Sequence, residues 1–332
     1  MSSRSEPAAD APKRPAGGAR PLVERVALAV PACVLALAWG APRLPAGVLP
    51  PWVRAAEAQA SPAAARGALP GAPAGVLRVC ADPNNLPFSD STGRGFENRI
   101  ARVLAAELGD SVAYTWWAQR RGFVRNTLKA RRCDVVIGAP AGDEQMKTTA
   151  PYYRSTYVFV TRRGALAPVR SFDDPRLRRL TVGVHVIGDD GNSLPPGVAL
   201  ARRGIVTNVR GYSIYGDYRE ESPPARLIDA VARGDVDVAV AWGPLAGYYA
   251  RRSRVPLVVT PVDPRPADGP AARMVFGMAL GLRRGEDSLR TALEGALARR
   301  RGEVRRILAD YGVPLVNAPP GGAPGAAARE GA

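Results

Sequence analysis

Strand-like and helix-like patterns alternate along residues 77–160, and this alternation restricts the fold more than any other feature of the chain. Residues 76–80, 112–116 and 134–137 form short apolar runs of the kind that become buried strands. In residues 95–109 the apolar side chains recur every three or four positions, as on one face of a helix, and a glycine ends the pattern. Strands that alternate with helices form mostly parallel sheets, so this segment predicts an α/β lobe.

A second set of similar elements follows and predicts a second lobe of like topology. The string ARLIDAVARGDVDVAVAW repeats the plan of VRNTLKARRCDVVIGAP: a helix, a basic turn, an Asp-Val pair and a buried strand. We therefore expect the helix of the first copy to cover residues 121–132. In the second set we expect strands at 180–186, 205–209 and 236–241. We expect helices at 224–233 and 243–252, and another that follows the loop at 188–193 and ends at Leu200.

The last part of the chain is expected to return to the first lobe. It predicts one strand and two helices, at 274–283, 286–300 and 302–311. The first lobe would then be discontinuous and would cover 76–160 and 264–317. The second lobe would cover 165–257. Two extended crossings would join the lobes as a hinge, near 158–164 and 256–264.

Both ends of the chain differ from the part between them. Arginines precede an apolar run at 26–39, and the small-x-small triplet at 58–60 resembles a signal-peptidase site. Residues 1–60 therefore predict an export signal and a periplasmic protein, with an uncleaved membrane anchor as the alternative. The Ala-, Pro- and Gly-rich segments 61–75 and 318–332 predict a linker and a disordered tail.

The chain has 332 residues and a formal net charge of +16, which comes mostly from arginine. The basic residues are spread over every predicted element without a nucleic-acid-binding motif, so we expect no nucleic-acid partner. They form either a solvated surface or a face that attracts an acidic partner protein. No spacing of His, Cys or carboxylate residues suits a metal, and we expect no directly bound cofactor.

The residue inventory argues against an enzyme. His185 is the only histidine, and its apolar surroundings in the sequence predict a buried core residue. No catalytic set of Ser, Cys, His or paired carboxylates can be assembled, so an enzyme on this fold, such as a small dehydratase, is the least favoured alternative. Cys80 and Cys133 would lie toward opposite ends of parallel neighbouring strands, which favours two buried thiols over a disulfide.

The loop after the first strand is the main candidate for a binding cleft, because ligands of α/β lobes bind beyond the carboxyl ends of the strands. Its candidates are Asp82, Asn84, Asn85 and Phe88; alternatively, the prolines and asparagines only build a rigid turn. Further cleft candidates are Trp116, Pro140, Tyr212 and Trp242. A cleft rich in aromatic residues suits an apolar small molecule or an inserted peptide.

Trp116 and Trp117 point to opposite faces of their strand, so only one of them can join the core. The other is either a cleft wall or an exposed anchor for a partner. The candidate docking surface consists of Trp117, Arg120, Arg121, Phe123 and Arg125. A solvated helix start is the alternative.

Five strings resemble the binding-protein-like accessory proteins of methanol oxidation, the MxaJ/XoxJ type: LRVCADPNNLPFS, GFENRIA, YTWWAQRRGFVRNTL, CDVVIGAPAG and PYYRSTYVFV. The resemblance implies the type 2 periplasmic binding-protein fold, with two α/β lobes and a two-stranded hinge. It also implies a periplasmic partner that supplies the chemistry, a pyrroloquinoline-quinone (PQQ)-dependent methanol or alcohol dehydrogenase, with its cytochrome c as a second candidate partner. The dehydrogenase would hold the PQQ and a metal ion, and this chain would support its activation or maturation.

Departures from the related amino-acid receptors argue against an amino-acid ligand. Those receptors place an arginine for the ligand carboxylate after the third strand, where Gln145 stands here. Their second-lobe turn suits anions, whereas Asp189 and Asp190 of the turn here oppose one. Asp189 and Asn192 of this turn are further cleft candidates. The resemblance places Tyr152 near the cleft mouth, with hinge packing as the alternative. The alternative function is a substrate-binding protein of an ABC transporter for a small solute that is not an amino acid.

Overall fold

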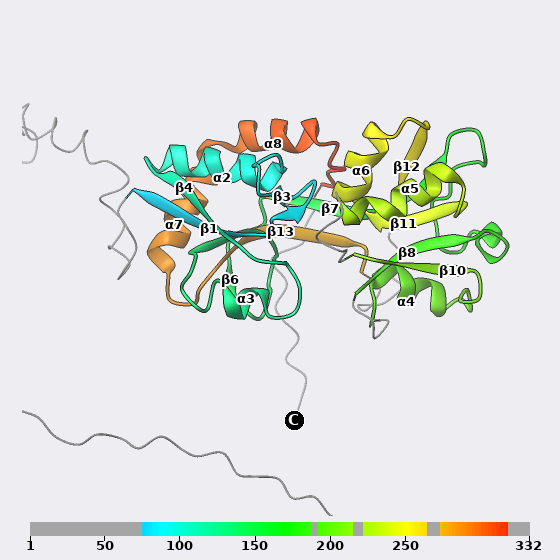
Figure 1. Cartoon of the computed structure of the whole chain (residues 1–332), viewed down its shortest axis with the longest axis horizontal. Helices are drawn as coiled ribbons and strands as arrows, with labels where there is room; N and C mark the ends of the chain where they lie inside the picture. Colours follow the sequence, from blue (N-terminus) through cyan, green and yellow to red (C-terminus); the bar gives the residue numbers. More distant parts are fainter. Residues whose placement is uncertain (1–74, 188–191, 215–221, 264–272, 318–332) are drawn as a thin grey trace, which may run out of the picture. The chain divides into compact units, whose positions relative to one another are not determined.

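The computed structural model describes residues 75–187, 192–214, 222–263 and 273–317. The expected export segment and tail lie outside these ranges, as does the expected linker except for Gly75. Within them, no helix has both the length and the apolar character needed to cross a membrane. The described residues build two α/β lobes on one mixed sheet of 11 strands (Figure 1).

The sheet of the first lobe is centred on β1 (Val76–Ala81), which runs parallel to both of its neighbours, β4 (Ser111–Trp116) and β5 (Val135–Pro140). β13 (Val275–Leu282) returns from the end of the chain and pairs antiparallel with β5. The short strand β6 (Lys147–Thr148) also pairs with β13. The predicted α/β lobe, with its C-terminal strand, is thus present.

Three helices cover one face of this sheet. α2 (Phe96–Glu107) buries Phe96 and Ile100 completely, as its apolar spacing predicts. The predicted C-terminal helices are α7 (Asp287–Arg299) and α8 (Arg301–Asp310), and their apolar side chains join the same core. The orange and red helices in Figure 1 therefore lie beside cyan α2, although they are far from it in the sequence.

One long strand, β7 (Tyr153–Arg162), belongs to both lobes. Its residues up to Thr156 pair with β13, and those from Tyr157 onward pair with strands of the second lobe. One of these is β12 (Leu257–Pro261), so most of the crossing that we expected near 256–264 also lies within the second-lobe sheet. The crossing that we expected near 158–164 therefore lies earlier, because residues 158–162 are already held in the second-lobe sheet.

The second lobe adds three mutually parallel strands, of which β11 (Val238–Trp242) pairs antiparallel with β7. β8 (Val182–Ile187) lies between β10 (Val209–Ser213) and β11, and the short β9 (Asn192–Ser193) pairs with β8. The strand expected at 205–209 begins at its last residue instead. The turn at 202–204 ends the preceding helix, and residues 205–208 form an irregular connection to β10.

Helices pack on both faces of the second-lobe sheet. α5 (Arg226–Arg233) and α6 (Gly243–Arg252) form a core on one face. α4 (Pro195–Ala201) and the 3₁₀ turn η2 (Pro175–Arg178) form a core on the other face. A second 3₁₀ turn, η3 (Pro223–Ala225), leads into α5 and lies at the boundary with the first lobe.

Cys80 and Cys133 form a disulfide, so the expectation of two buried thiols is wrong. That expectation treated Cys133 as the start of a strand. In the structure β5 begins only at Val135, so the rise of the strand does not fix the position of Cys133. The turn before β5 brings its Cα atom to 5.4 Å from that of Cys80, and both residues lie in the small core beneath α3 (Phe123–Asn126).

The helix expected over 121–132 is much shorter than its sequence pattern suggests. Only the four residues of α3 are helical. Gly122 precedes them with a φ of 89°, and the Thr127 hydroxyl donates to the Phe123 carbonyl just after them. The chain then turns again at Arg131, which has a φ of 58°. The remaining residues of this segment form successive turns on the protein surface.

His185 is buried in β8, as its apolar sequence context predicts. Burial lowers the pKa of His185 to about 4, although a hydrogen bond to the backbone of Pro224 works in the opposite direction. The Nε2 atom has no hydrogen-bond partner among the described residues. The side chain is thus neutral at neutral pH and joins β8 to η3.

Asp134 anchors the base of the first lobe. Its carboxylate accepts hydrogen bonds from Arg78 Nε at 2.8 Å and from Arg283 Nη2 at 2.8 Å. Burial works to raise the pKa of Asp134, but these guanidinium groups hold it below its ordinary value. The cluster joins β1, the start of β5 and the residue after β13.

Candidate functional site

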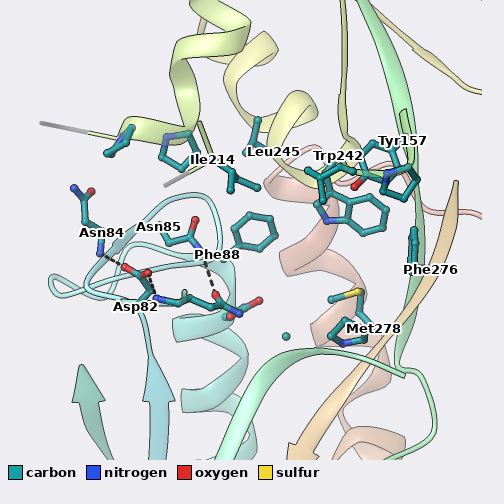
Figure 2. Close-up of a pocket in the computed structure, with 18 residues that line it drawn as sticks. Asp82, Asn84, Asn85, Phe88, Tyr157, Ile214, Trp242, Leu245, Phe276 and Met278 are labelled. Atoms are coloured by element: carbon teal, nitrogen blue, oxygen red, sulfur yellow. Dashed lines mark hydrogen bonds between the residues drawn. The ribbon is translucent and has the colours of Figure 1, made fainter. Parts of the chain in front are cut away.

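A cavity of about 540 Å³ lies between the two lobes. The first lobe lines it mainly with the loop after β1 and the start of α2, and the second lobe with η3 and the start of α6. Figure 2 shows Phe88 reaching from the first-lobe loop toward Ile214 and Leu245 of the second lobe. Tyr157 and Trp242 gather on another side of the same space.

The loop after β1 is held by hydrogen bonds to the buried carboxylate of Asp82. Its Oδ1 accepts from the N–H of Asn84 at 2.8 Å, and its Oδ2 accepts from the N–H of Gln119 at 2.6 Å. The side-chain amide of Asn85 donates to Gln119 Oε1 at 3.1 Å. Asp82 therefore fixes the loops that follow β1 and β4 relative to each other, which agrees with the rigid-turn interpretation of this loop.

Three aromatic rings form one wall of the cavity where the chain crosses between the lobes. Tyr157 of β7 meets Trp242 edge to face at 5.4 Å, and Trp242 meets Phe276 of β13 at 5.8 Å. Each ring comes from a different strand of the sheet. Edge-to-face pairs of this kind add roughly 0.5–1.5 kcal/mol each beyond the area they bury, so this wall is a firm part of the site.

Two contacts join the lobes over the cavity. The ring of Phe88 packs against apolar residues of both lobes and meets Phe96 edge to face at 5.4 Å. The hydroxyl of Tyr249 on α6 donates to the carbonyl of Leu86 at 2.9 Å. The first-lobe loop is thus seated directly on the second lobe.

Glu97 is the charged group of the cavity that our sequence reasoning missed. It lies in the first turn of α2, whose start is fixed because Asn98 Oδ1 accepts from the N–H of Gly95 at 3.1 Å. Burial, reinforced by the nearby charge of Asp82, raises the pKa of Glu97 from 4.5 to about 8. A signal was present, since position 97 falls in the same three-to-four-residue register as the buried Ile100 and Leu104.

Gly138 makes room for this carboxyl group. A Cβ atom at position 138 would lie only 1.8 Å from Glu97 Oε1, so no side chain larger than hydrogen fits there without moving Glu97. Gly138 lies in the middle of β5, and both residues line the cavity. The glycine in this otherwise apolar strand is therefore explained by a carboxyl group packed against the backbone.

Six of the residues that we expected in a cleft do line the cavity: Asp82, Asn84, Asn85, Phe88, Pro140 and Trp242. Trp116, Tyr152 and Tyr212 do not. Trp116 stacks on Tyr114 at 4.5 Å, and the Tyr152 hydroxyl donates to the Ile137 carbonyl at 3.1 Å. Asn192 lies in β9, whereas Asp189 and Asp190 lie outside the described residues. That any of these residues binds a ligand stays a prediction.

The candidate docking residues divide into two groups. Trp117, Arg120, Arg121 and Arg125 are exposed. Phe123 is only 6% exposed and packs in the core beside the disulfide, so it cannot contact a partner directly. Its place among the docking candidates was wrong because the short α3 turns this ring inward.

The described part of the lining defines the chemistry of the cavity. It is mostly apolar and contains the carboxyl groups of Asp82 and Glu97 but no lysine, arginine or histidine. Gln145, at the position where receptors carry their arginine, is exposed and lies outside this lining. Among the described residues, no three His, Cys, Asp or Glu side chains are grouped so that they could hold a metal ion.

Residues 77–313 match the family of bacterial extracellular solute-binding proteins, family 3. The chain is 33% identical over 268 residues to Protein MoxJ of Methylorubrum extorquens AM1. The matched region covers 79% of this chain and 88% of MoxJ. The crystal structure of the periplasmic binding protein XoxJ from Methylobacterium extorquens AM1 is similar at 36% identity and a TM-score of 0.60, over 73% of this chain and all of XoxJ. MxaJ from Methlophaga aminisulfidivorans MPT is similar at 25% identity and a TM-score of 0.61, over 72% of this chain and all of MxaJ.

Proposed function

This chain belongs to family 3 of the bacterial extracellular solute-binding proteins, and we propose that it acts as a periplasmic accessory protein of a PQQ-dependent methanol or alcohol dehydrogenase. In this proposal it is not itself an enzyme. It binds the dehydrogenase and supports its activation or maturation, while the dehydrogenase holds the PQQ and the metal ion. The observation that supports the proposal most is the similarity to MoxJ and XoxJ along most of both chains.

The cavity fits poorly with a receptor for free amino acids. Such a ligand brings a carboxylate, which a buried site binds with a cationic fork or with free backbone amides. The described lining offers no basic side chain, and the backbone N–H groups of Asn84, after β1, and Gln119, after β4, already donate to Asp82. The second carboxyl group of the lining, that of Glu97, offers the ligand no positive charge either.

The surface over the disulfide fits a docking role. Residues 117–132 contain five arginines and one lysine and no carboxylate, and all six basic side chains are exposed. The guanidinium of Arg132 lies 5.7 Å from the ring centre of Trp117, a residue that is 36% exposed. We call residues 117–132 the basic surface. An aromatic anchor among cations attracts and then holds an acidic protein face.

The disulfide makes the basic surface rigid. Cys133 follows directly after it and is bonded to Cys80 of β1, while Phe123 and Leu128 of the surface segment are buried in the core beneath. A segment made mostly of turns is thereby held in one arrangement before a partner arrives. Less conformational entropy is then lost on binding.

The proposal is tested by measuring the binding of the purified chain to a PQQ-dependent methanol dehydrogenase at low and at moderate salt. We expect an affinity that falls with salt, and a loss of about tenfold or more in the double variant Arg120→Glu/Arg121→Glu. The matched control is Arg305→Glu/Arg306→Glu, which makes the same charge change at two exposed residues of α8. It should bind within about twofold of the unaltered chain.

An equal loss in both double variants would mean that net charge rather than the basic surface governs binding. Absence of binding to holo and to metal-free dehydrogenase would overturn the accessory role. The alternative is then a substrate-binding protein of an ABC transporter for a small solute that is not an amino acid, which the cavity between the lobes favours. Binding of this chain to an ABC-transporter permease, and not to the dehydrogenase, would support this alternative function.

A further inference from the structure

We propose that the cavity between the lobes binds a small organic cation, an ammonium group on an apolar chain, with the carboxylate of Glu97 as its counter-ion. This inference goes beyond the accessory role and does not depend on it. It would hold equally if the chain delivered a solute to a permease.

The first argument is the way the fold places Glu97. The side chain extends from the first turn of α2 into the space over Gly138, where a Cβ atom would come within 1.8 Å of its Oε1. Within the described residues, its carboxyl group forms neither a hydrogen bond nor an ion pair. Gly138, near the middle of β5, thus leaves room for the carboxyl group of Glu97, which has no partner among the described residues.

The second argument is the charge around Glu97. The carboxylate of Asp82 acts on Glu97, and Glu97 in turn acts on the nearby phenols of Tyr114, Tyr152 and Tyr153. Burial raises the pKa of each of these tyrosines, so all three are neutral. The described lining contains two acidic side chains and no basic one, although the whole chain is strongly basic. A lining with acidic and without basic side chains disfavours an anionic ligand.

The third argument is the apolar and aromatic character of the walls. Tyr157, Trp242 and Phe276 form one side, and Phe88 with Leu245 faces the space from the two lobes. Aromatic faces attract cations, and apolar walls bury an alkyl chain. A cavity of about 540 Å³ is large enough for an amine with a chain of several carbons but selects against bulky polar solutes.

The proton of Glu97 gives this binding a measurable signature. Because burial raises the pKa of Glu97 to about 8, the empty site is mostly protonated at neutral pH. An ammonium ligand stabilises the ionised carboxylate, so the carboxyl proton leaves to solvent as the ion pair forms. The ligand keeps its own protons, and no other group changes charge.

Three probes with the same six-carbon chain test the inference by titration calorimetry on the whole exported chain: hexylammonium, 1-hexanol and hexanoate. Their head groups are cationic, neutral and anionic. We expect hexylammonium to bind most tightly, with a gain in affinity of about tenfold between pH 7 and pH 9 as Glu97 ionises in the empty site. At pH 7 we expect close to one proton to be released per bound ligand, which buffers of different ionisation enthalpy reveal.

The variant Glu97→Gln keeps the shape of the side chain and should lose both the pH dependence and the preference for hexylammonium over 1-hexanol. Glu144→Gln, the same change at an exposed loop residue, should keep both. A thermal unfolding curve confirms that each variant is folded. The inference is overturned if 1-hexanol or hexanoate binds as tightly as hexylammonium, if Glu97→Gln retains the preference, or if none of the probes binds. None of these outcomes bears on the dehydrogenase titration, so the two proposals fail separately.

Discussion

Replacing Glu97 by glutamine should make the protein more stable at alkaline pH and leave it nearly unchanged in acid. Burial raises the pKa of Glu97 from 4.5 to about 8 in the folded chain, whereas the unfolded chain keeps the lower value. Between these two pH values the unfolded chain releases a proton that the folded chain retains. Stability contributed by the protonated carboxyl group is therefore complete below pH 4.5 and is lost as the pH rises through 8.

The size of this effect follows from the same shift. At about 1.4 kcal/mol per pKa unit, a rise from 4.5 to about 8 corresponds to at most ~5 kcal/mol of unfolding free energy. The Glu97 carboxyl group borders the cavity, so water there screens part of the penalty. We therefore expect Glu97→Gln to gain ~2 to 4 kcal/mol relative to the unaltered chain between about pH 5 and pH 9.

The assay is urea unfolding of both chains at these two pH values, followed by fluorescence. Taking the difference between the variant and the unaltered chain removes the contributions of all other titrating groups. Glu144→Gln serves again as the exposed control and should show no change. If the advantage of Glu97→Gln at pH 9 does not exceed its value at pH 5, the carboxyl group is not held protonated by burial, and the reasoning fails.

Three other predictions concern the scaffold. Burial lowers the pKa of His185 to about 4, so stability should fall by up to ~3 kcal/mol as the pH drops from about 6.5 to 4; His185→Gln should abolish this part of the acid sensitivity in urea titrations. Changing both Cys80 and Cys133 to alanine frees a loop with a sequence separation of 53 residues and should lower the unfolding free energy by ~4 kcal/mol; an unchanged urea midpoint would contradict this. Asp134→Ala leaves two guanidinium groups without their shared partner and should destabilise the chain by ~3–5 kcal/mol, as measured by scanning calorimetry. Asp287→Ala, the same change at an exposed residue, should have little effect in that measurement.

Regular periodic segments were predictable from the sequence. α6 begins at Gly243 and ends at Arg252 as the pattern predicts, and α2 differs from its expected span by only a residue or two at each end. Both helices have a continuous apolar face that packs on a sheet, so local sequence and tertiary packing favour the same structure.

The segment around α3 could not be predicted in the same way. Its apolar residues Phe123 and Leu128 suggested one long helix, but the disulfide of Cys133 and the left-handed Arg131 require a chain of turns. The disulfide is a contact to a neighbouring strand that residue spacing does not reveal. Tertiary geometry here overrides helix propensity.

The candidate site divides along the same line. Asp82, Phe88 and Trp242 were predictable because they lie at the carboxyl ends of strands, where the topology of an α/β lobe puts its ligand-facing loops. Glu97 and Phe276 were missed because one lies on a helix that reads as core and the other on a strand from the end of the chain. Their place at the cavity depends on how distant elements pack, and no local pattern encodes that.

The position of β13 in the sheet has a consequence for the order of folding. β13 lies between β7 and β5, so the last strand among the described residues is a central one, and the sheet is complete only when residues 275–282 have been synthesised. A shorter nascent chain would hold two half-sheets, each with an unpaired inner edge that invites aggregation. Folding to the native state must therefore wait until residues 275–282 have been synthesised.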